Sequence, residues 1–530
     1  GSSALALNTL KKYPQPPFLA TAIMAQTMDG RHISLLEPDE SFSPAARTKL
    51  PSKSMTVSSL DQHLVEMKYA VRGAVVAKAA ELQKQLDDGE ELPFKEIIPC
   101  NIGNPHAVHQ KPITFYRQVA ACCVCPSLCE SKDMPEDVKK RASEYLAATN
   151  GNGVGAYTGS TGLKFVRDQI AAFIERRDGF PADPEMIELH TGASEGVKRI
   201  IMALISKQSD VLMIPKPQYP LYSAALTMFG GTAQYYDCAE EKDWTVTREE
   251  LDRAYAEGSE GEHKIKAIAV INPGNPTGNV LTLEGVKMFI TFARDKGVPI
   301  LADEVYQTNI YDDTKEFHSF KKVLRMLQEI DSSYDSVQLM SFHSTSKGIT
   351  GECGLRGGYT EFVGMSERVM ALFVKVASTS LSSNTLGQIM CGLMVTPPKD
   401  GDPSYALFEK ETTGIFAGLK ERAKLLSEGL NSIEGISTRQ IQGAMYAFAK
   451  VEIPEKAIAA AKEKGMQGDE FWCLQLVGQT GIVCVPGTGF GQKEGTFRFR
   501  ITILPPTDML KGMLKRLGDF QQNFKKEWAA

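Results

Sequence analysis

The sequence lacks several features that would place it in a class at once. It has no apolar run long enough to cross a bilayer, so we expect no membrane-spanning segment. It also has no excess of basic residues, since 59 Lys and Arg stand against 64 Asp and Glu, for a formal net charge of −5. Nucleic-acid binding by bulk charge needs concentrated Lys and Arg, so that class of partner is not expected. Low-complexity tracts and internal repeats are absent as well.

The ten cysteines do not suggest a disulfide framework in a chain of 530 residues, which favours a reducing compartment. Cys122, Cys123, Cys125 and Cys129 are close enough in sequence to suggest a metal site. They lack paired spacings and a nearby His, however, and the run VAACCVCPSLCE is more typical of the apolar side of a helix. We therefore expect these cysteines to pack and expect no metal.

The compartment is left open by the chain ends. Residues 1–28 contain no acidic residue, as in a mitochondrial transit peptide, but they also lack the Arg that such a peptide normally contains. The C-terminal residues KKEWAA are not a peroxisomal signal of the SKL type. The sequence is thus compatible with a cytoplasmic protein or with one of the mitochondrial matrix.

A chain of this length can bury one large core or two linked ones. From about 185 to 365, short apolar runs alternate with amphipathic helices, which is typical of βαβ units and an α/β fold. After the run MIELHTGAS, for example, Val197, Ile200, Ile201 and Leu204 fall on one face of a helix. The pattern predicts a mostly parallel central sheet flanked by helices.

The flanking segments predict a smaller α/β domain built from both chain ends. A helix is expected from Ser58 to Leu86, another near 411–432, and short strands near 444–451 and 496–503. The predicted division is an N-terminal extension (1–57), the first part of the small domain (58–130), a large domain (131–390) and the rest of the small domain (391–530).

Five predicted strands of the central sheet end in polar residues, where ligands of parallel α/β sheets bind. Each motif alone has an ordinary explanation: NPGNPTG forms a turn, Asp303 caps a helix, and Lys347 is a surface lysine. The ordered set is more specific. It consists of Ala193 and Ser194 in TGASEG, Tyr219 in KPQYP, Asn275 in NPGNPTG, Asp303 and Tyr306 in ADEVY, and Ser344, Ser346 and Lys347 in STSKG, with Arg356 nine residues further on.

The order of these motifs resembles that of the class I, fold-type I pyridoxal-phosphate aminotransferases. KYAVRGAVV, NIGNPH, YTGSTGL and VPGTGFGQKEGTFRFRITILP resemble the alanine aminotransferase subgroup in particular. The segment between Lys347 and Arg356 contains the extra residues GECGL. It is therefore longer than in aspartate aminotransferases, and its length agrees with the alanine aminotransferase subgroup. The resemblance runs from about residue 60 to the C-terminus and leaves the first 50 or so residues outside.

The resemblance implies pyridoxal 5'-phosphate as the cofactor and a role for each matched residue. Lys347 would form the Schiff base with the cofactor aldehyde, and Asp303 would keep the pyridine nitrogen protonated so that the ring accepts electrons. Asn275 and Tyr306 would hydrogen-bond the ring hydroxyl oxygen, and Tyr219 would stack on the ring.

The resemblance also implies how the cofactor phosphate is held. Ala193 and Ser194 would offer it the N-terminus of a helix, and Ser344 or Ser346 with Arg356 would add charge-assisted bonds. Tyr157 resembles the tyrosine that reaches the cofactor phosphate of the neighbouring subunit. That match implies a homodimer with shared active sites.

For the substrate, Arg500 in FRFRITILP matches the arginine that binds the α-carboxylate, and Gly103 matches a position beside the substrate. Arg498 lies two residues away on the same strand face, so the choice of Arg500 follows from the family match alone. The ordinary interpretation of Arg498 is a surface strand residue.

The implied reaction is a ping-pong transfer from L-alanine to 2-oxoglutarate, giving pyruvate and L-glutamate, with Lys347 as imine partner and proton carrier. Three alternatives stay open: a glutamate:glyoxylate aminotransferase, a carbon–sulfur or γ-elimination lyase on the same fold, and a non-catalytic relative. The sequence does not identify the group that would meet the side-chain carboxylate of glutamate.

Overall fold

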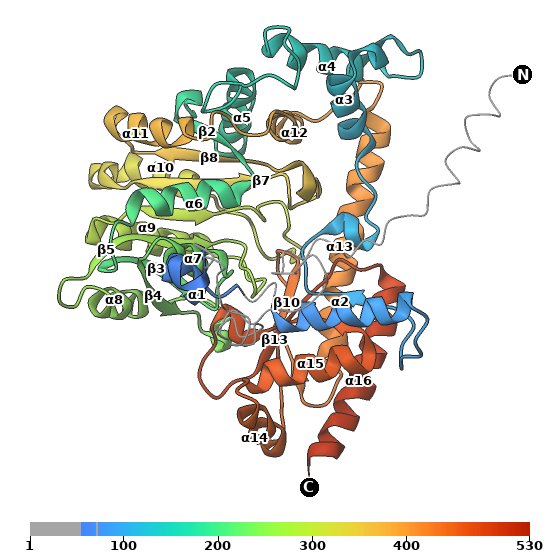
Figure 1. Cartoon of the computed structure of the whole chain (residues 1–530). Coiled ribbons are helices and arrows are strands. Elements are labelled where there is room, and N and C mark those ends of the chain that lie inside the picture. The colour runs from blue at the N-terminus through green and yellow to red at the C-terminus, as the bar shows by residue number, and fades with distance from the viewer. Residues whose placement is uncertain (1–54, 70–72, 530) are drawn as a thin grey trace, which may run out of the picture.

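The computed structural model describes residues 55–69 and 73–529. At its centre lies a seven-stranded sheet in the order β2-β8-β7-β6-β5-β3-β4 (Figure 1). Strand β8 runs antiparallel to both of its neighbours, and the remaining pairs are parallel, which confirms the predicted mostly parallel α/β sheet. The strands are β2 (Ile187–Thr191), β3 (Asp210–Lys216), β4 (Thr232–Asp237), β5 (Lys264–Ile271), β6 (Ile300–Asp303), β7 (Leu339–Ser344) and β8 (Gly357–Val363).

Alternate residues of the central strands face two different helix layers. On β3, Leu212 and Ile214 pack in one core, which contains side chains of α6, α7 and α11. Met213, between them, packs in the opposite core with side chains of α8, α9 and α10. Apolar residues on both faces are what a buried parallel strand requires. These helices are α6 (Ala193–Leu204), α7 (Leu221–Met228), α8 (Arg248–Glu257), α9 (Leu283–Lys296), α10 (Phe320–Ile330) and α11 (Glu367–Ser378).

A third core lies at the β2 end of the sheet, at the top of Figure 1. It is built by α3 (Thr114–Val124), α4 (Glu136–Ala148), α5 (Lys164–Asp178) and α12 (Thr385–Val395) together with residues of β2 and β8. From α12 the chain continues into the long helix α13 (Tyr405–Asn431), which runs from this region to a second packing unit (Figure 1).

The second unit has a four-stranded antiparallel sheet in the order β12-β13-β10-β9 and a short parallel pair of β1 with β11. Its core combines residues between Val75 and Val108 with residues between Leu419 and Phe524, so both parts of the chain build it. The strands are β1 (Ile98–Pro99), β9 (Ile436–Ser437), β10 (Tyr446–Val451), β11 (Ile482–Val483), β12 (Val485–Pro486) and β13 (Arg498–Thr502), and the helices are α2 (Ala74–Asp87), α14 (Glu455–Glu463), α15 (Gly468–Thr480) and α16 (Thr507–Trp528).

The segments expected near 411–432, 444–451 and 496–503 are therefore α13, β10 and β13. The domain limits themselves stay a prediction. The packing favours one change to these limits. Buried residues between 113 and 123 pack with the helices beside β2 and not with the small unit. We accordingly propose that the large domain begins near residue 113.

The predicted helix from Ser58 to Leu86 is wrong in its extent. A short helix, α1 (Gln62–Glu66), ends at Met67, whose backbone is extended, and α2 begins only after the extended Gly73. The interruption has a structural reason, since Tyr69 leaves the helical path and bonds to the large domain. Residues 1–54, which make up most of the predicted extension, lie outside the described residues.

The helical interpretation of the cysteine cluster holds for only two of its members. Cys122 and Cys123 are buried on α3, but the helix ends at Val124. Cys125 is exposed, and Cys129 lies in a short 3-10 turn that begins at Pro126. A proline disfavours a helical backbone in the residue before it, which explains why the helix stops there.

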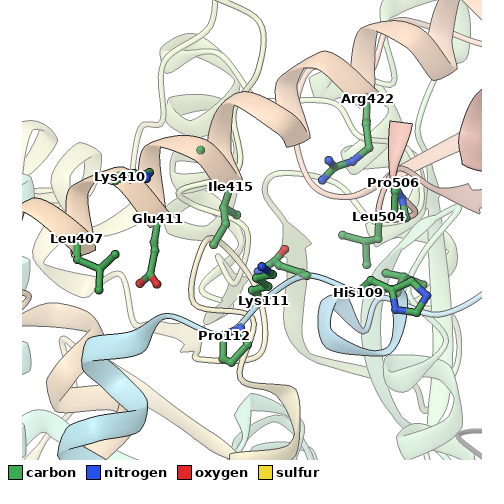
Figure 2. Close-up of a pocket in the computed structure, with 13 residues that line it drawn as sticks. His109, Lys111, Pro112, Leu407, Lys410, Glu411, Ile415, Arg422, Leu504 and Pro506 are labelled. Carbon is green, nitrogen blue, oxygen red and sulfur yellow. The ribbon is translucent and has the colours of Figure 1, made fainter. Parts of the chain in front are cut away.

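A hollow of about 490 Å³ lies where α13 passes the segment 108–112 and the residues that lead into α16 (Figure 2). Lys111, Glu411 and Arg422 are among its lining residues, whereas the predicted cofactor residues within the described chain are not. The central sheet, and not this hollow, therefore positions the candidate site. Within residues 55–69 and 73–529, no helix combines the length and the hydropathy needed to span a membrane.

Candidate active site

Lys347 lies three residues beyond β7, at the carboxyl edge of the central sheet. Its Nζ donates a hydrogen bond of 3.2 Å to the carbonyl oxygen of Gly103 and lies 5.8 Å from the centre of the Tyr306 ring. Gly103 belongs to the segment just after β1, and Tyr306 follows β6. The lysine is thus held between the two packing units.

Asp303 is the last residue of β6, in the middle of the same edge. Its Oδ2 accepts a hydrogen bond of 3.1 Å from the hydroxyl of Tyr222, while the buried Oδ1 has no partner among the described residues. Burial raises the pKa of Asp303 to about 6. The hydrogen bonds from Tyr222 and from the backbone of Val305, together with the charge of Lys347, act to lower that pKa. A buried carboxylate with a free oxygen fits the protonated nitrogen of a pyridine ring.

The N-terminus of α6 and the loops beside it offer groups that can bind an anion. The Arg356 guanidinium donates to the hydroxyls of Ser194 and Ser346 over 3.3 and 3.4 Å. Gly192 has φ +82°, and a Cβ there would stand 2.2 Å from Nη2 of Arg356, so a side chain would displace the arginine. A helix N-terminus, a guanidinium and two hydroxyls are the usual partners of a phosphate.

Ser344 and Ser346 have different surroundings. The Ser344 hydroxyl donates to the carbonyl oxygen of Gly357 over 3.1 Å and accepts from the backbone N–H of Ser346 over 3.1 Å. The Ser346 hydroxyl instead faces Arg356. The geometry therefore favours Ser346, of the two serines, as the one beside a phosphate.

Tyr219 follows β3, and its hydroxyl shares a hydrogen bond of 2.8 Å with that of Tyr69. Burial is the main reason why the pKa of Tyr219 is raised well above its ordinary value, so the group stays neutral. Tyr157 does not join this cluster, and 78% of its surface is exposed in the single chain. It is the one predicted cofactor residue that this chain leaves at its own surface.

Arg500, in the middle of β13, is almost fully buried. It donates hydrogen bonds of 3.0 Å to Oδ1 of Asn275 and 2.7 Å to the carbonyl oxygen of Asn101, and its Nε has no partner among the described residues. Its guanidinium carbon lies 4.0 Å from the centre of the Tyr446 ring. A buried guanidinium with an unused N–H fits a carboxylate ligand.

The interpretation of Arg498 as a surface residue is wrong. Its side chain is buried, forms an ion pair with Glu240 in which Nη1 and Oε1 are 3.0 Å apart, and lies over the Trp244 ring. Although the two arginines share a strand face, Arg498 already has an anionic partner. Arg500 has only neutral ones, which makes Arg500 the arginine available to a carboxylate.

The sequence motifs assign no role to four further residues of the site: Tyr69, Asn101, Tyr222 and Tyr446. Tyr69 and Asn101 lie in the motifs KYAVRGAVV and NIGNPH, which indicate the subgroup but not what these two residues do. The nearest indication for Tyr222 is its position three residues after Tyr219, at the start of a helix. Tyr446 could be inferred only from the pairing of β10 with the arginine-bearing β13.

The sequence and the fold of this chain match a known enzyme family. A model of the family described as "Aminotransferase class I and II" matches residues 126–517. The chain belongs to this family. It is an aminotransferase, and its cofactor is pyridoxal 5'-phosphate. Asp303, with its free buried oxygen, fits the ring nitrogen of that cofactor, and the guanidinium of Arg356 beside Gly192 fits its phosphate.

Two similar proteins within this family are named alanine aminotransferases. The chain is 43% identical to alanine aminotransferase 2 of Xenopus laevis, over 97% of this chain and 96% of that protein. It is 44% identical to human alanine aminotransferase 1, over 92% of this chain and 98% of that protein. Among solved structures, an alanine aminotransferase from Pyrococcus furiosus shares the fold with a TM-score of 0.68 and 24% identity, covering 88% of this chain and all of that one.

Proposed function

We propose that this aminotransferase moves the amino group of L-alanine to 2-oxoglutarate, giving pyruvate and L-glutamate in two half-reactions. The observation that carries the proposal is a pair of unused buried groups in one site, Oδ1 of Asp303 and Nε of Arg500. The carboxylate oxygen suits a protonated ring nitrogen, and the guanidinium N–H suits an α-carboxylate. Lys347 lies in the same site. The choice of alanine is supported by relatives that are named alanine aminotransferases and cover nearly the whole chain.

When bound, the cofactor would supply an aldehyde for Lys347 and an electron-withdrawing ring that stabilises negative charge at the substrate Cα. Lys347 carries the proton between the substrate Cα and the accepting carbon, because its amine is the only basic amine among the residues that we place in the site. Asp303 would hold the ring nitrogen through its ionised carboxylate and keep that nitrogen protonated. Arg356, Ser194 and Ser346 would bind the phosphate at the start of α6.

Arg500 binds and orients the substrate. Its bonds to Asn275 and to the carbonyl of Asn101 fix the guanidinium plane, so the remaining N–H edge can pair with a carboxylate in one orientation. That orientation decides which bond of Cα points toward the lysine. The neighbouring Tyr446 ring covers one face of the guanidinium and excludes water from it.

The proposal includes a homodimer with shared sites. Tyr157 has a large exposed side chain, and the adjacent backbone carbonyl of Ala156 accepts a hydrogen bond of 3.4 Å from Thr385 at the start of α12. A side chain on such an anchored segment can reach the cofactor phosphate of a second subunit. Exchange of subunits between a Tyr157→Ala chain and a Lys347→Ala chain should restore activity in part. One of the two sites in the mixed dimer then combines Lys347 of the first chain with Tyr157 of the second.

For the compartment we propose the cytoplasm or the mitochondrial matrix. A relative from Dictyostelium discoideum, 44% identical over 90% of this chain, is named a probable mitochondrial alanine aminotransferase. Ten free cysteines in the described chain agree with a reducing environment. Fractionation of the native cells, followed by immunodetection of the chain, decides between the two.

A panel of donors and acceptors tests the reaction. Initial rates should be high with L-alanine and 2-oxoglutarate. With L-glutamate as the donor, they should be higher with pyruvate than with glyoxylate as the acceptor. A preference for glyoxylate would replace the proposal by a glutamate:glyoxylate aminotransferase. Release of ammonia without any oxo acid would indicate a lyase, and no spectral change with any amino acid would indicate a non-catalytic relative.

A further inference from the structure

Tyr446 lies in the centre of the site, and its hydroxyl, unlike its ring, has no role in the proposal above. It is the first residue of β10, and its side chain is buried. Its ring lies beneath the guanidinium of Arg500 and stands at 85° to the Tyr306 ring, with 6.3 Å between the ring centres. The ring therefore supports the arginine, but that contact does not use the hydroxyl.

The hydroxyl of Tyr446 points at the segment that holds the lysine. A Cβ built on Gly103 would stand 2.0 Å from this oxygen and 3.1 Å from Nζ of Lys347. The hydroxyl and the amine thus flank the same point in space, and the missing side chain at Gly103 is what allows both to approach. In the structure, Nζ donates to the Gly103 carbonyl, and an ammonium group has three hydrogens to donate.

The charges around Tyr446 make its hydroxyl a good acceptor. Burial by itself would raise the pKa of Tyr446, but the positive charges of Lys347 and Arg500 and a hydrogen bond from Tyr306 outweigh burial and the opposing Cys353, so the pKa is lowered. The neighbouring Tyr306 and Tyr219 behave in the opposite way, with pKa values raised well above the ordinary range mainly by burial. Among these three tyrosines, Tyr446 is therefore the one whose hydroxyl faces the charges that favour its ionisation.

We propose that Tyr446 is a positioning residue for Lys347, whose hydroxyl oxygen accepts a hydrogen bond from the protonated lysine nitrogen and holds it beside Gly103. The inference rests on the proposed function, since it assigns Lys347 its place in the same site. A lysine has a flexible four-carbon stem, so an amine that carries a proton between two carbons needs a second fixed partner. Tyr446 supplies that partner while its ring keeps Arg500 in place.

The first test compares the cofactor-loaded wild-type enzyme with Tyr446→Phe, which removes the oxygen and keeps the ring on Arg500. The midpoint of the pH titration of cofactor absorption should move to lower pH by about one unit, as expected for one hydrogen bond to a charged group. With L-alanine, kcat should fall about tenfold while KM stays within about twofold, because the ring is retained.

Tyr311→Phe is the matched control. Tyr311 is also a buried tyrosine of this part of the chain, and its hydroxyl donates to the carbonyl of Ala444 over 2.7 Å. This variant should leave the midpoint unchanged. A Tyr446→Phe midpoint equal to that of the wild type, or an equal shift in both variants, would overturn the proposal.

The second test needs neither substrate nor cofactor. Ultraviolet difference titration of the cofactor-free full chain should show a tyrosine that ionises below the ordinary value of 10. That step should be missing in Tyr446→Phe, shifted upward in Lys347→Ala and unchanged in Tyr311→Phe. Its persistence in Tyr446→Phe would overturn the inference. Failure of the proposed function would have a different result. Both titrations would then give the shifts expected above, but the enzyme would not turn over alanine.

Discussion

The hydroxyl of Tyr222 donates to one oxygen of Asp303 over 3.1 Å, and the other carboxylate oxygen is left without a partner in the described part of the chain. This contact fixes the rotation of the carboxylate and leaves the other oxygen free for the ring nitrogen that the proposed function assigns to it. It also partly offsets the cost of an ionised carboxylate in a buried site.

The first prediction concerns the pH dependence of cofactor binding. Asp303 must be ionised to pair with the ring nitrogen, but burial raises its pKa to about 6 in the cofactor-free protein. Below that pH the carboxyl is protonated and has to release its proton on binding. Affinity should therefore be constant above about pH 6 and fall by up to about tenfold per pH unit below it, as measured by fluorescence titration.

Two variants control for the titration of the cofactor itself. Asp303→Asn should bind more weakly and lack this step, whereas a step due to the cofactor phosphate would remain. Tyr222→Phe removes a hydrogen bond that lowers the pKa of Asp303, so its step should move to higher pH. Identical profiles for the wild type and Asp303→Asn would contradict the pairing.

The second prediction concerns Lys347→Ala. Loss of the amine should reduce alanine-dependent pyruvate formation by at least about a thousandfold, because imine formation and proton transfer both depend on it. The cofactor should still bind, since Asp303 and the guanidinium of Arg356 are untouched. Equilibrium dialysis and a coupled pyruvate assay measure the two effects, and near-normal turnover would refute the assignment of Lys347.

The third prediction separates the two arginines of β13. Arg500→Lys should raise KM for L-alanine about ten- to a hundredfold, because a lysine cannot reproduce the bidentate geometry. Arg498→Lys is the matched control two residues away. It weakens the ion pair with Glu240, so it should lower the unfolding midpoint and leave KM nearly unchanged. Similar KM increases in both variants would show that the carboxylate is not specific to Arg500.

The fourth prediction concerns Gly103→Ala. The added Cβ would stand 2.0 Å from the Tyr446 oxygen, so the variant should lose stability by about 1–3 kcal/mol and lose most of its turnover. Adding Tyr446→Phe removes the clashing oxygen and should recover part of the stability. Thermal unfolding of the single and double variants measures this coupling, and strictly additive losses would argue against the close approach.

The central sheet could be predicted because its strands and helices have strong local patterns. The same patterns end at Asp303 and Lys347, and both lie at the carboxyl edge of the sheet in the structure. The N-terminal helix was harder to predict, because its interruption depends on Tyr69 reaching Tyr219 across the two units. Local propensity contains no information on such a distant contact.

Tyr446 and the choice between Arg498 and Arg500 could not be derived from local sequence for a related reason. Residues two apart on a strand share a face, so only their tertiary partners distinguish them. Here those partners are Glu240 for one arginine and Asn275 for the other, both from distant segments. Tyr446 reaches the site through the antiparallel pairing of β10 with β13, which no motif records.

The most direct test of the central claim is a half-reaction measured without an acceptor. The cofactor-loaded enzyme, mixed with excess L-alanine and no 2-oxo acid, should release one pyruvate per active site, stop, and resume when 2-oxoglutarate is added. Lys347→Ala should release none on this timescale. Continuous pyruvate and ammonia release without 2-oxoglutarate, or no pyruvate from the wild type, would contradict a transamination of alanine centred on Lys347.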